Sequence, residues 1–134
     1  MKRLLSLLLL LAMPAMAAEP LVTQVKASAA QIMEAASQVA PQQRQVIGNT
    51  ITFKTFVTID IDSFGIFPVL EKVWVDGSIV AKDNKFKVEL ANALIFGSSC
   101  ENHPTLGKNC EQAINYAQET MAKSILIALD KANF

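Results

Sequence analysis

The stretch VIGNTITFKTFVTIDID, residues 46–62, decides the fold class, because apolar and polar residues alternate along it. A period of two is typical of a β-strand with one buried face. The run is long enough to bend or break once. The apolar positions are Ile47, Ile51, Phe53, Val57, Ile59 and Ile61, and the polar ones are Thr50, Thr52, Lys54, Thr58, Asp60 and Asp62.

The strand pattern continues downstream of this stretch. Residues 66–82, IFPVLEKVWVDGSIVAK, fit one bent strand or two short ones, with Pro68 at an edge or a strand start and Asp76-Gly77 as a possible turn. Residues 82–85 have the composition of a hairpin turn. The following strand would place on one side Phe86, Val88, Leu90, Leu94 and Phe96. We predict a three- to four-stranded antiparallel meander.

Helical periodicity flanks the meander on both sides. Upstream, apolar residues recur at steps of three and four from Val22 to Val39, which predicts a helix that ends at Pro41. Ser28 with Gln31 fits a capping box and allows a shorter helix from residue 29, but the periodicity favours the longer one. Downstream, Asn109 with Gln112 is a plausible N-cap pair. The apolar stripe that follows comprises Cys110, Ile114, Ala117, Met121, Ile125, Ala128 and Ala132.

The predicted fold class is therefore α+β. An N-terminal helix, an antiparallel meander and a C-terminal helix would form one small domain, with both helices packed on the apolar face of the sheet. No internal repeat or low-complexity segment interrupts residues 18–134.

The N-terminus has the pattern of a secretory signal peptide. Lys2 and Arg3 precede an apolar run, and Ala15-Met16-Ala17 is an A-x-A cleavage site, which predicts a cleaved segment of residues 1–17. Cleavage after Ala18 is the nearby alternative. The apolar run is about half the roughly 20 residues that a membrane-spanning helix needs. We expect a periplasmic or secreted protein with no transmembrane anchor after processing.

The charge of the remaining chain argues against two classes of partner. Loss of Lys2 and Arg3 leaves 12 − 2 = 10 basic against 12 acidic residues, a net charge of −2. Neither a basic face nor a basic run is visible. Nucleic acid is therefore not expected as a partner, and a polybasic membrane patch is absent as well.

The two cysteines, Cys100 and Cys110, enclose a loop with a proline and a glycine. In an oxidising compartment such a pair usually forms a disulfide, which would tie the end of the last strand to the first turn of the last helix. The alternatives are a metal site that uses His103 and a nearby glutamate, and a reactive thiol pair. The spacing is not C-x-x-C, and four zinc ligands are not evident, so we predict a structural disulfide and no metal or cofactor.

Catalytic patterns are weak in this chain. Asp60 and Asp62 share a strand face and could act as acid and base or bind calcium, but a solvated strand face explains them as well. Ser98 and Ser99 lie near His103 without a G-x-S-x-G context. We therefore predict that the protein is not an enzyme, and an activity that uses His103 remains a minor alternative.

The stretch SFGIFPVLEKVW, residues 63–74, is richer in apolar side chains than alternation requires. These side chains could complete the core, or they could form an exposed patch that binds a partner. We predict a non-catalytic interaction module that docks a protein partner, or a second copy of itself, through this stretch or through a sheet edge. The alternative is a carrier of a small apolar or lipid-like ligand between sheet and helices. The candidate binding residues are Phe64, Ile66, Phe67, Val69 and Trp74.

Overall fold

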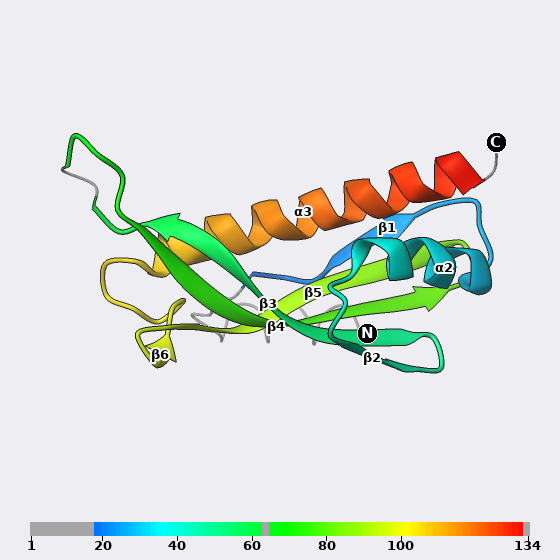
Figure 1. The fold of residues 1–134 in the computed structure, drawn as a ribbon, viewed down its shortest axis with the longest axis horizontal. Coiled ribbons are helices and arrows are strands. Elements are labelled where there is room, and N and C mark those ends of the chain that lie inside the picture. Colours follow the sequence, from blue (N-terminus) through cyan, green and yellow to red (C-terminus); the bar gives the residue numbers. More distant parts are fainter. Residues whose placement is uncertain (1–17, 63–64, 133–134) are drawn as a thin grey trace, which may run out of the picture.

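The computed structural model describes residues 18–62 and 65–132, and it has the predicted α+β architecture. A twisted antiparallel sheet is accompanied by two helices, the longer of which runs along the sheet (Figure 1). In chain order the elements are β1 Leu21–Gln24, α2 Ala29–Val39, β2 Arg44–Ile47, β3 Thr50–Asp60, β4 Leu70–Lys82, β5 Lys85–Ile95, β6 Ser98–Ser99 and α3 Gly107–Ala132.

The sheet has six strands, more than the three or four predicted. Its order is β1-β5-β4-β3-β2, and β6 pairs with β5. The three long strands β3, β4 and β5 are the predicted meander, and the turn at residues 82–85 joins the last two. The alternating stretch 46–62 breaks at Gly48, whose φ of +57° suits a tight turn, so it forms both β2 and β3.

The predicted longer N-terminal helix is wrong, and the shorter alternative is confirmed. Residues 21–24 form β1, which pairs with residues 85–88 of β5. The helix begins only after Ser28, whose hydroxyl accepts the Gln31 N–H while the Gln31 side chain accepts the Ser28 N–H. This capping box fixes the helix start, and pairing with β5 overrides the weak helical periodicity upstream of it.

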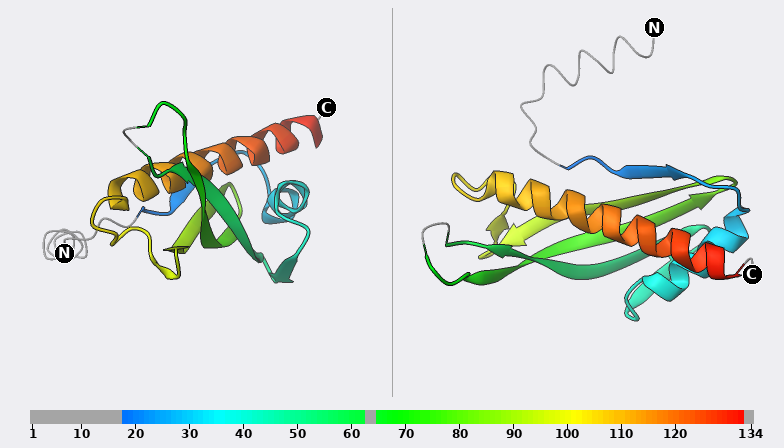
Figure 2. Two further views of the ribbon diagram at one scale, coloured as in Figure 1. Left: turned by 60° about the vertical axis from the view of Figure 1, so that its left-hand side comes forward. Right: turned by 90° about the horizontal axis from the view of Figure 1, so that it is seen from above.

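Both helices contribute to one core on one face of the sheet (Figure 2). Along β3 and β4 the buried side chains are the odd-numbered ones, and α2 adds Ile32, Ala35 and Ala36. On α3 the buried stripe differs from the predicted one, since Gln118 and Ala122 face the sheet in place of Ala117 and Met121. The buried residues of α3 are Gly107, Cys110, Ile114, Gln118, Ala122, Ile125 and Leu129.

The prediction that Leu94 and Phe96 share a side with Phe86 is wrong, because β5 contains a bulge. The pairing with β4 shifts between Trp74↔Leu94 and Asp76↔Ala91, which leaves an additional residue on β5. Asn92 has a φ of +55° at this place, and its side chain donates to the Asp76 carboxylate. Since an additional residue reverses the alternation, Leu94 points away from the core.

Two further boundaries differ from the prediction. Asp76-Gly77 is not a turn but lies within β4, which is one long strand. Helix α3 begins at Gly107, two residues before the predicted N-cap at Asn109. A side chain at position 107 would meet the carbonyl of Glu101, so glycine allows this close approach of helix and loop.

Candidate interaction surface

The described parts of the connection between β3 and β4, residues 61–62 and 65–69, project beyond the end of the sheet (Figure 1). Ile66 and Phe67 are 94% and 79% exposed there. The base of this hairpin is closed by a backbone hydrogen bond from Ile61 N to Val69 O, and Asp60 Oδ1 accepts the N–H groups of Asp62 and Val69. The sequence therefore builds a supported loop that holds two large apolar side chains in solvent.

A row of apolar side chains crosses the sheet on the face opposite the helices. Phe56 on β3 lies opposite Trp74 on β4, which lies opposite Leu94 on β5. The Phe56 and Trp74 rings pack edge-to-face with centroids 5.4 Å apart. All three side chains remain substantially exposed. Aromatic pairs of this kind bury a large area on binding and are frequent at the energetic centre of interfaces.

Two neighbours on β4 extend this row towards the hairpin. Leu70 is exposed on the same face, and the Lys72 ammonium lies 4.5 Å from the centroid of the Phe56 ring. We call Phe56, Leu70, Trp74 and Leu94 the open-face patch. An apolar centre with a cation beside it suits a partner that presents apolar side chains next to a carboxylate.

The predicted candidate residues therefore fall into two groups. Ile66 and Phe67 lie on the projecting hairpin, with Val69 at its base, whereas Trp74 belongs to the open-face patch. Phe64 lies outside the described residues. The sequence analysis missed Phe56 and Leu94. Phe56 could have been found as the one aromatic residue at a polar position of the 46–62 alternation, but Leu94 could not, because its orientation depends on the bulge.

A groove of about 770 Å³ opens between β3 and the part of α3 from Asn109 to Ser124. Helix α2 ends at Val39 and leaves this part of the helix-bearing face uncovered. The strand contributes Val57 and Ile59, and the helix contributes Ala117 and Met121. The groove is largely apolar and open to solvent along the margin of β3.

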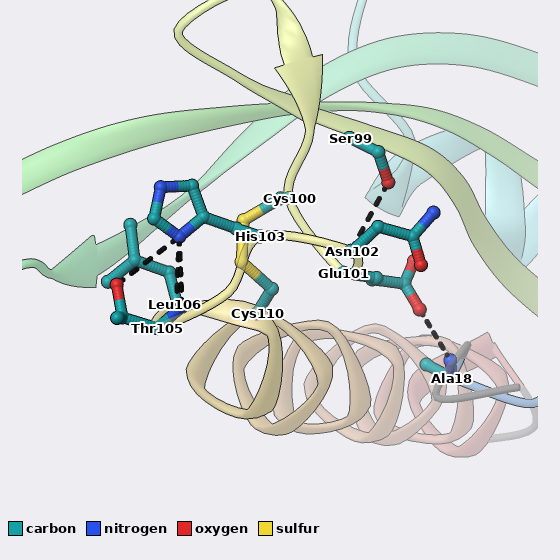
Figure 3. The surroundings of a disulfide bond; sticks show 9 residues. All are labelled: Ala18, Ser99, Cys100, Glu101, Asn102, His103, Thr105, Leu106 and Cys110. Atoms are coloured by element: carbon teal, nitrogen blue, oxygen red, sulfur yellow. Dashed lines mark hydrogen bonds between the residues drawn. A yellow bond between two sulfur atoms is a disulfide. The ribbon is translucent and has the colours of Figure 1, made fainter. Parts of the chain in front are cut away.

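The two cysteines form a disulfide, as predicted (Figure 3). Cys100 and Cys110 are fully buried, with Cα atoms 5.9 Å apart, and the bond ties the end of the sheet to the first turn of α3. His103 Nδ1 accepts the N–H groups of Thr105 and Leu106, which holds the turn that leads into the helix. The role that the structure gives His103 is therefore local support of this loop.

Glu101 connects the disulfide loop to the start of the described chain. Its Oε2 accepts the backbone N–H of Ala18 at 3.0 Å, as Figure 3 shows. The pKa of Glu101 is raised above its ordinary value of 4.5. Burial is the largest cause and the Glu111 charge adds to it, whereas the hydrogen bond from Ala18 partly offsets them by lowering the pKa. Ala18 itself packs against the core, so this contact fixes the point at which the chain enters the fold.

Among residues 18–62 and 65–132, no three histidine, cysteine, aspartate or glutamate side chains gather closely enough to hold a metal ion. In the same part of the chain, neither α2 nor α3 combines the length and hydropathy of a membrane span. Asp60 is engaged in the hairpin base described above.

Comparisons with known proteins place the fold but not a family. No protein-family model matches the chain, and no curated protein matches its sequence. A solved structure of a TBP-like protein from Parabacteroides distasonis superposes with a TM-score of 0.59 at 12% sequence identity, over 84% of this chain and 91% of that one. At this identity the likeness concerns the fold alone, which is TBP-like.

Proposed function

We propose that this protein is an exported, non-catalytic module that binds a protein partner through the open-face patch and the projecting hairpin. The observation that carries the proposal is the exposure of Trp74 and Phe67, at 52% and 79%, on a domain that already has a continuous core. Folding does not require large apolar side chains on the side of the sheet away from the helices. Gathered apolar groups in solvent usually mark a binding surface.

The architecture supports this assignment in a second way. The open-face patch is carried by β3, β4 and β5, whose pairing with one another holds the side chains in fixed positions. A rigid surface loses little conformational entropy on binding. The projecting hairpin beside the patch adds the exposed Ile66 and Phe67, which would insert into a pocket of the partner.

The test is site-specific photocrosslinking in cells that export the protein. A photoreactive residue at position 67 or 74 should give a discrete crosslinked product with the partner. Trp74→Ala and Phe67→Asp should each weaken binding of that partner by roughly thirtyfold or more, as expected for residues at an interface centre. The melting temperature of Phe67→Asp should change little, because that side chain is 79% exposed. Trp74→Ala also loses the ring contact with Phe56, so its binding is compared well below its own melting temperature.

Lys131, exposed in the last turn of α3 and remote in sequence from the patch, provides the matched control position. It should give no specific product. Products of equal intensity at positions 67, 74 and 131, or undiminished binding by both variants, would contradict the proposal.

Export is supported by the disulfide, which an oxidising compartment outside the cytoplasm permits. Removal of residues 1–17 on export would also change the contact between Ala18 and Glu101. Cleavage after Ala17 would turn the Ala18 nitrogen into an ammonium group 3.0 Å from the Glu101 carboxylate. An α-ammonium is charged at every pH below its pKa of about 7.7–8.0, so processing would convert a hydrogen bond into an ion pair.

This ion pair makes a prediction about pH. In protein that begins at Ala18, the ammonium should move the pKa of Glu101 below its ordinary value of 4.5. When the pKa of a carboxyl is lower in the folded than in the unfolded protein, its ionised form stabilises the fold at pH values above the unfolded-state pKa. That stabilisation is lost as the pH falls through the folded-state pKa. Acetylation of the Ala18 amine should remove the ammonium effect, leave the pKa raised by burial and reverse the sign of this pH dependence. NMR titration of the Glu101 carboxyl measures its pKa in the free-amine and the acetylated protein. Equal pKa values in the two would rule out the ion pair between Ala18 and Glu101.

The groove between β3 and α3 favours a second candidate function, a carrier of a small apolar ligand. Its lining is largely apolar, which such ligands require. It is an open groove at the margin of the sheet, so a ligand there would keep much of its surface in water. Native mass spectrometry of the exported protein would favour the carrier if an added mass disappears on denaturation.

A further inference from the structure

The margin of the sheet at β3 is only half covered. Strand β2 pairs with residues 50–53 of β3, from Ile47↔Thr50 to Arg44↔Phe53. Residues 54–60 pair with β4 on one side, and within the described chain no strand pairs with them on the other. The second half of β3 is therefore an edge strand, which we call the β3 edge.

The hydrogen bonds at the two ends of β3 show which backbone groups this edge presents. Ile61 N donates to Val69 O, and Asn49 O accepts from Ala81 N, so odd-numbered residues direct their backbone groups towards β4. The register between these ends has no shift. Because successive residues of a strand point their groups to opposite sides, the even-numbered residues of β3 direct N–H and C=O outwards. Phe56 and Thr58 lie beyond the end of the β2 pairing, so their groups are free to pair.

The β3 edge carries two charged residues on the open face, Lys54 and Asp60, but it lacks the other features by which proteins usually prevent unwanted strand pairing. It contains no proline and no bulge, and its side chains on the helix-bearing face, Thr55, Val57 and Ile59, carry no charge. Val57 and Ile59 also line the open groove beside α3. An added strand would therefore gain backbone hydrogen bonds on the edge and apolar contacts at the mouth of the groove.

The sequence of the β3 edge is complementary to itself, and we infer that its occupant is a second copy of this chain, paired antiparallel about Val57. This register places Lys54 opposite the second copy's Asp60, twice by symmetry. It also places Phe56 opposite Thr58, so the residues with outward backbone groups meet one another. Opposite charges at facing positions stabilise an antiparallel pair, whereas a parallel pairing would set like charges side by side.

The side chains of the edge agree with this pairing. On the helix-bearing face, Val57 meets its own copy and Thr55 meets Ile59, which covers apolar surface at the groove. Lys54 is available for the new contact, because its Nζ lies 3.9 Å from Asp76 and the two side chains are 84% and 49% exposed. An exposed pair of this length holds the ammonium weakly.

Analytical ultracentrifugation over a range of protein concentrations tests the inference with two variants at one position. Thr58→Pro removes an outward N–H that makes no bond within the described chain, so the fold should persist while the dimer dissociation constant rises roughly a hundredfold. Thr58→Val keeps the N–H and should remain dimeric. A monomeric unmodified protein, or a dimer that tolerates Thr58→Pro, would overturn the pairing.

A charge exchange tests the register. Lys54→Asp and Asp60→Lys should each weaken self-association, since each sets two like charges against each other across the pair. Mixing the two variants should restore a dimer that contains one copy of each, because both facing pairs are then attractive. Circular dichroism of each variant alone controls for folding, and a mixture that stays monomeric would contradict the register about Val57. The β3 edge shares Phe56 with the open-face patch but does not include Trp74, so partner binding through Trp74 can fail while self-association stands.

Discussion

Replacing Gln118 with leucine should lower the free energy of unfolding by about 3 kcal/mol, although the two side chains have similar volume. Gln118 is 2% exposed on the face of α3 that packs on the sheet. Its Oε1 accepts the Leu90 N–H at 2.9 Å, and its Nε2 donates to Glu19 O at 2.8 Å. Leu90 lies between the parts of β5 that pair with β1 and β6, so the glutamine supplies a partner that no strand provides.

Leucine would leave the buried Leu90 N–H without an acceptor, and that desolvation penalty is the source of the expected loss. Urea unfolding followed by circular dichroism measures this loss of unfolding free energy. Gln112→Leu is the matched control, since Gln112 is exposed on the same helix and should change stability by no more than about 0.5 kcal/mol. Equal effects of the two substitutions would show that the bridge through Gln118 contributes nothing specific.

Gly77→Ala should lower the free energy of unfolding by about 2 kcal/mol, although it adds only one methyl group. Gly77 lies opposite Phe53 in the β3–β4 pair, and a Cβ atom at this position would overlap the Phe53 ring. Phe53 is 6% exposed and packs in the core, so its ring has little room to move. The glycine is therefore required by the aromatic ring across the strand and not by a turn.

A double-mutant cycle isolates this contact. In a Phe53→Leu background the Gly77→Ala substitution should cost much less, because the smaller side chain leaves space for the new methyl group. Ser78→Ala, one residue along the same strand, should be nearly neutral since that side chain points to the open face. The same cost for Gly77→Ala in both backgrounds would place the strain elsewhere.

The long strands and the helices could be predicted because their periodicity reflects burial on one side. The alternation from Ile51 to Asp60 became β3, whereas the capping box at Ser28 indicated the start of α2 only as the alternative to the longer helix that we predicted. Both signals are local, so neighbouring residues are sufficient to read them. The disulfide was predicted from the number of cysteines and the export signal, and the structure contains it.

The errors arise where a distant segment decides the conformation. Residues 21–24 form a strand because they pair with the edge of β5 at residues 85–88. No local sequence pattern near Leu21 predicts that pairing. Leu94 points outwards because Asn92 adds a residue to β5. The predicted stripe on α3 contains only apolar residues and cysteine and so omits Gln118, whose two hydrogen bonds allow it to be buried.

The candidate surface was only partly foreseen for the same reason. The apolar excess in residues 63–74 pointed to Ile66, Phe67 and Trp74, which are exposed. Which side of the sheet the helices cover decides whether Trp74 lies in the core or in solvent. That choice depends on the contacts of α2 and α3 with β3, β4 and β5, which join residues far apart in the chain.

The sequence by itself determined the α+β class, the antiparallel meander and the pairing of Cys100 with Cys110, because each depends on spacing within one short segment. Only the tertiary structure decided that Phe56, Trp74 and Leu94 form one row, that Gln118 completes the sheet, and that residues 54–60 of β3 remain an open edge. Those features depend on which strands become neighbours. Strand order follows from the packing of the whole domain, which no local pattern records.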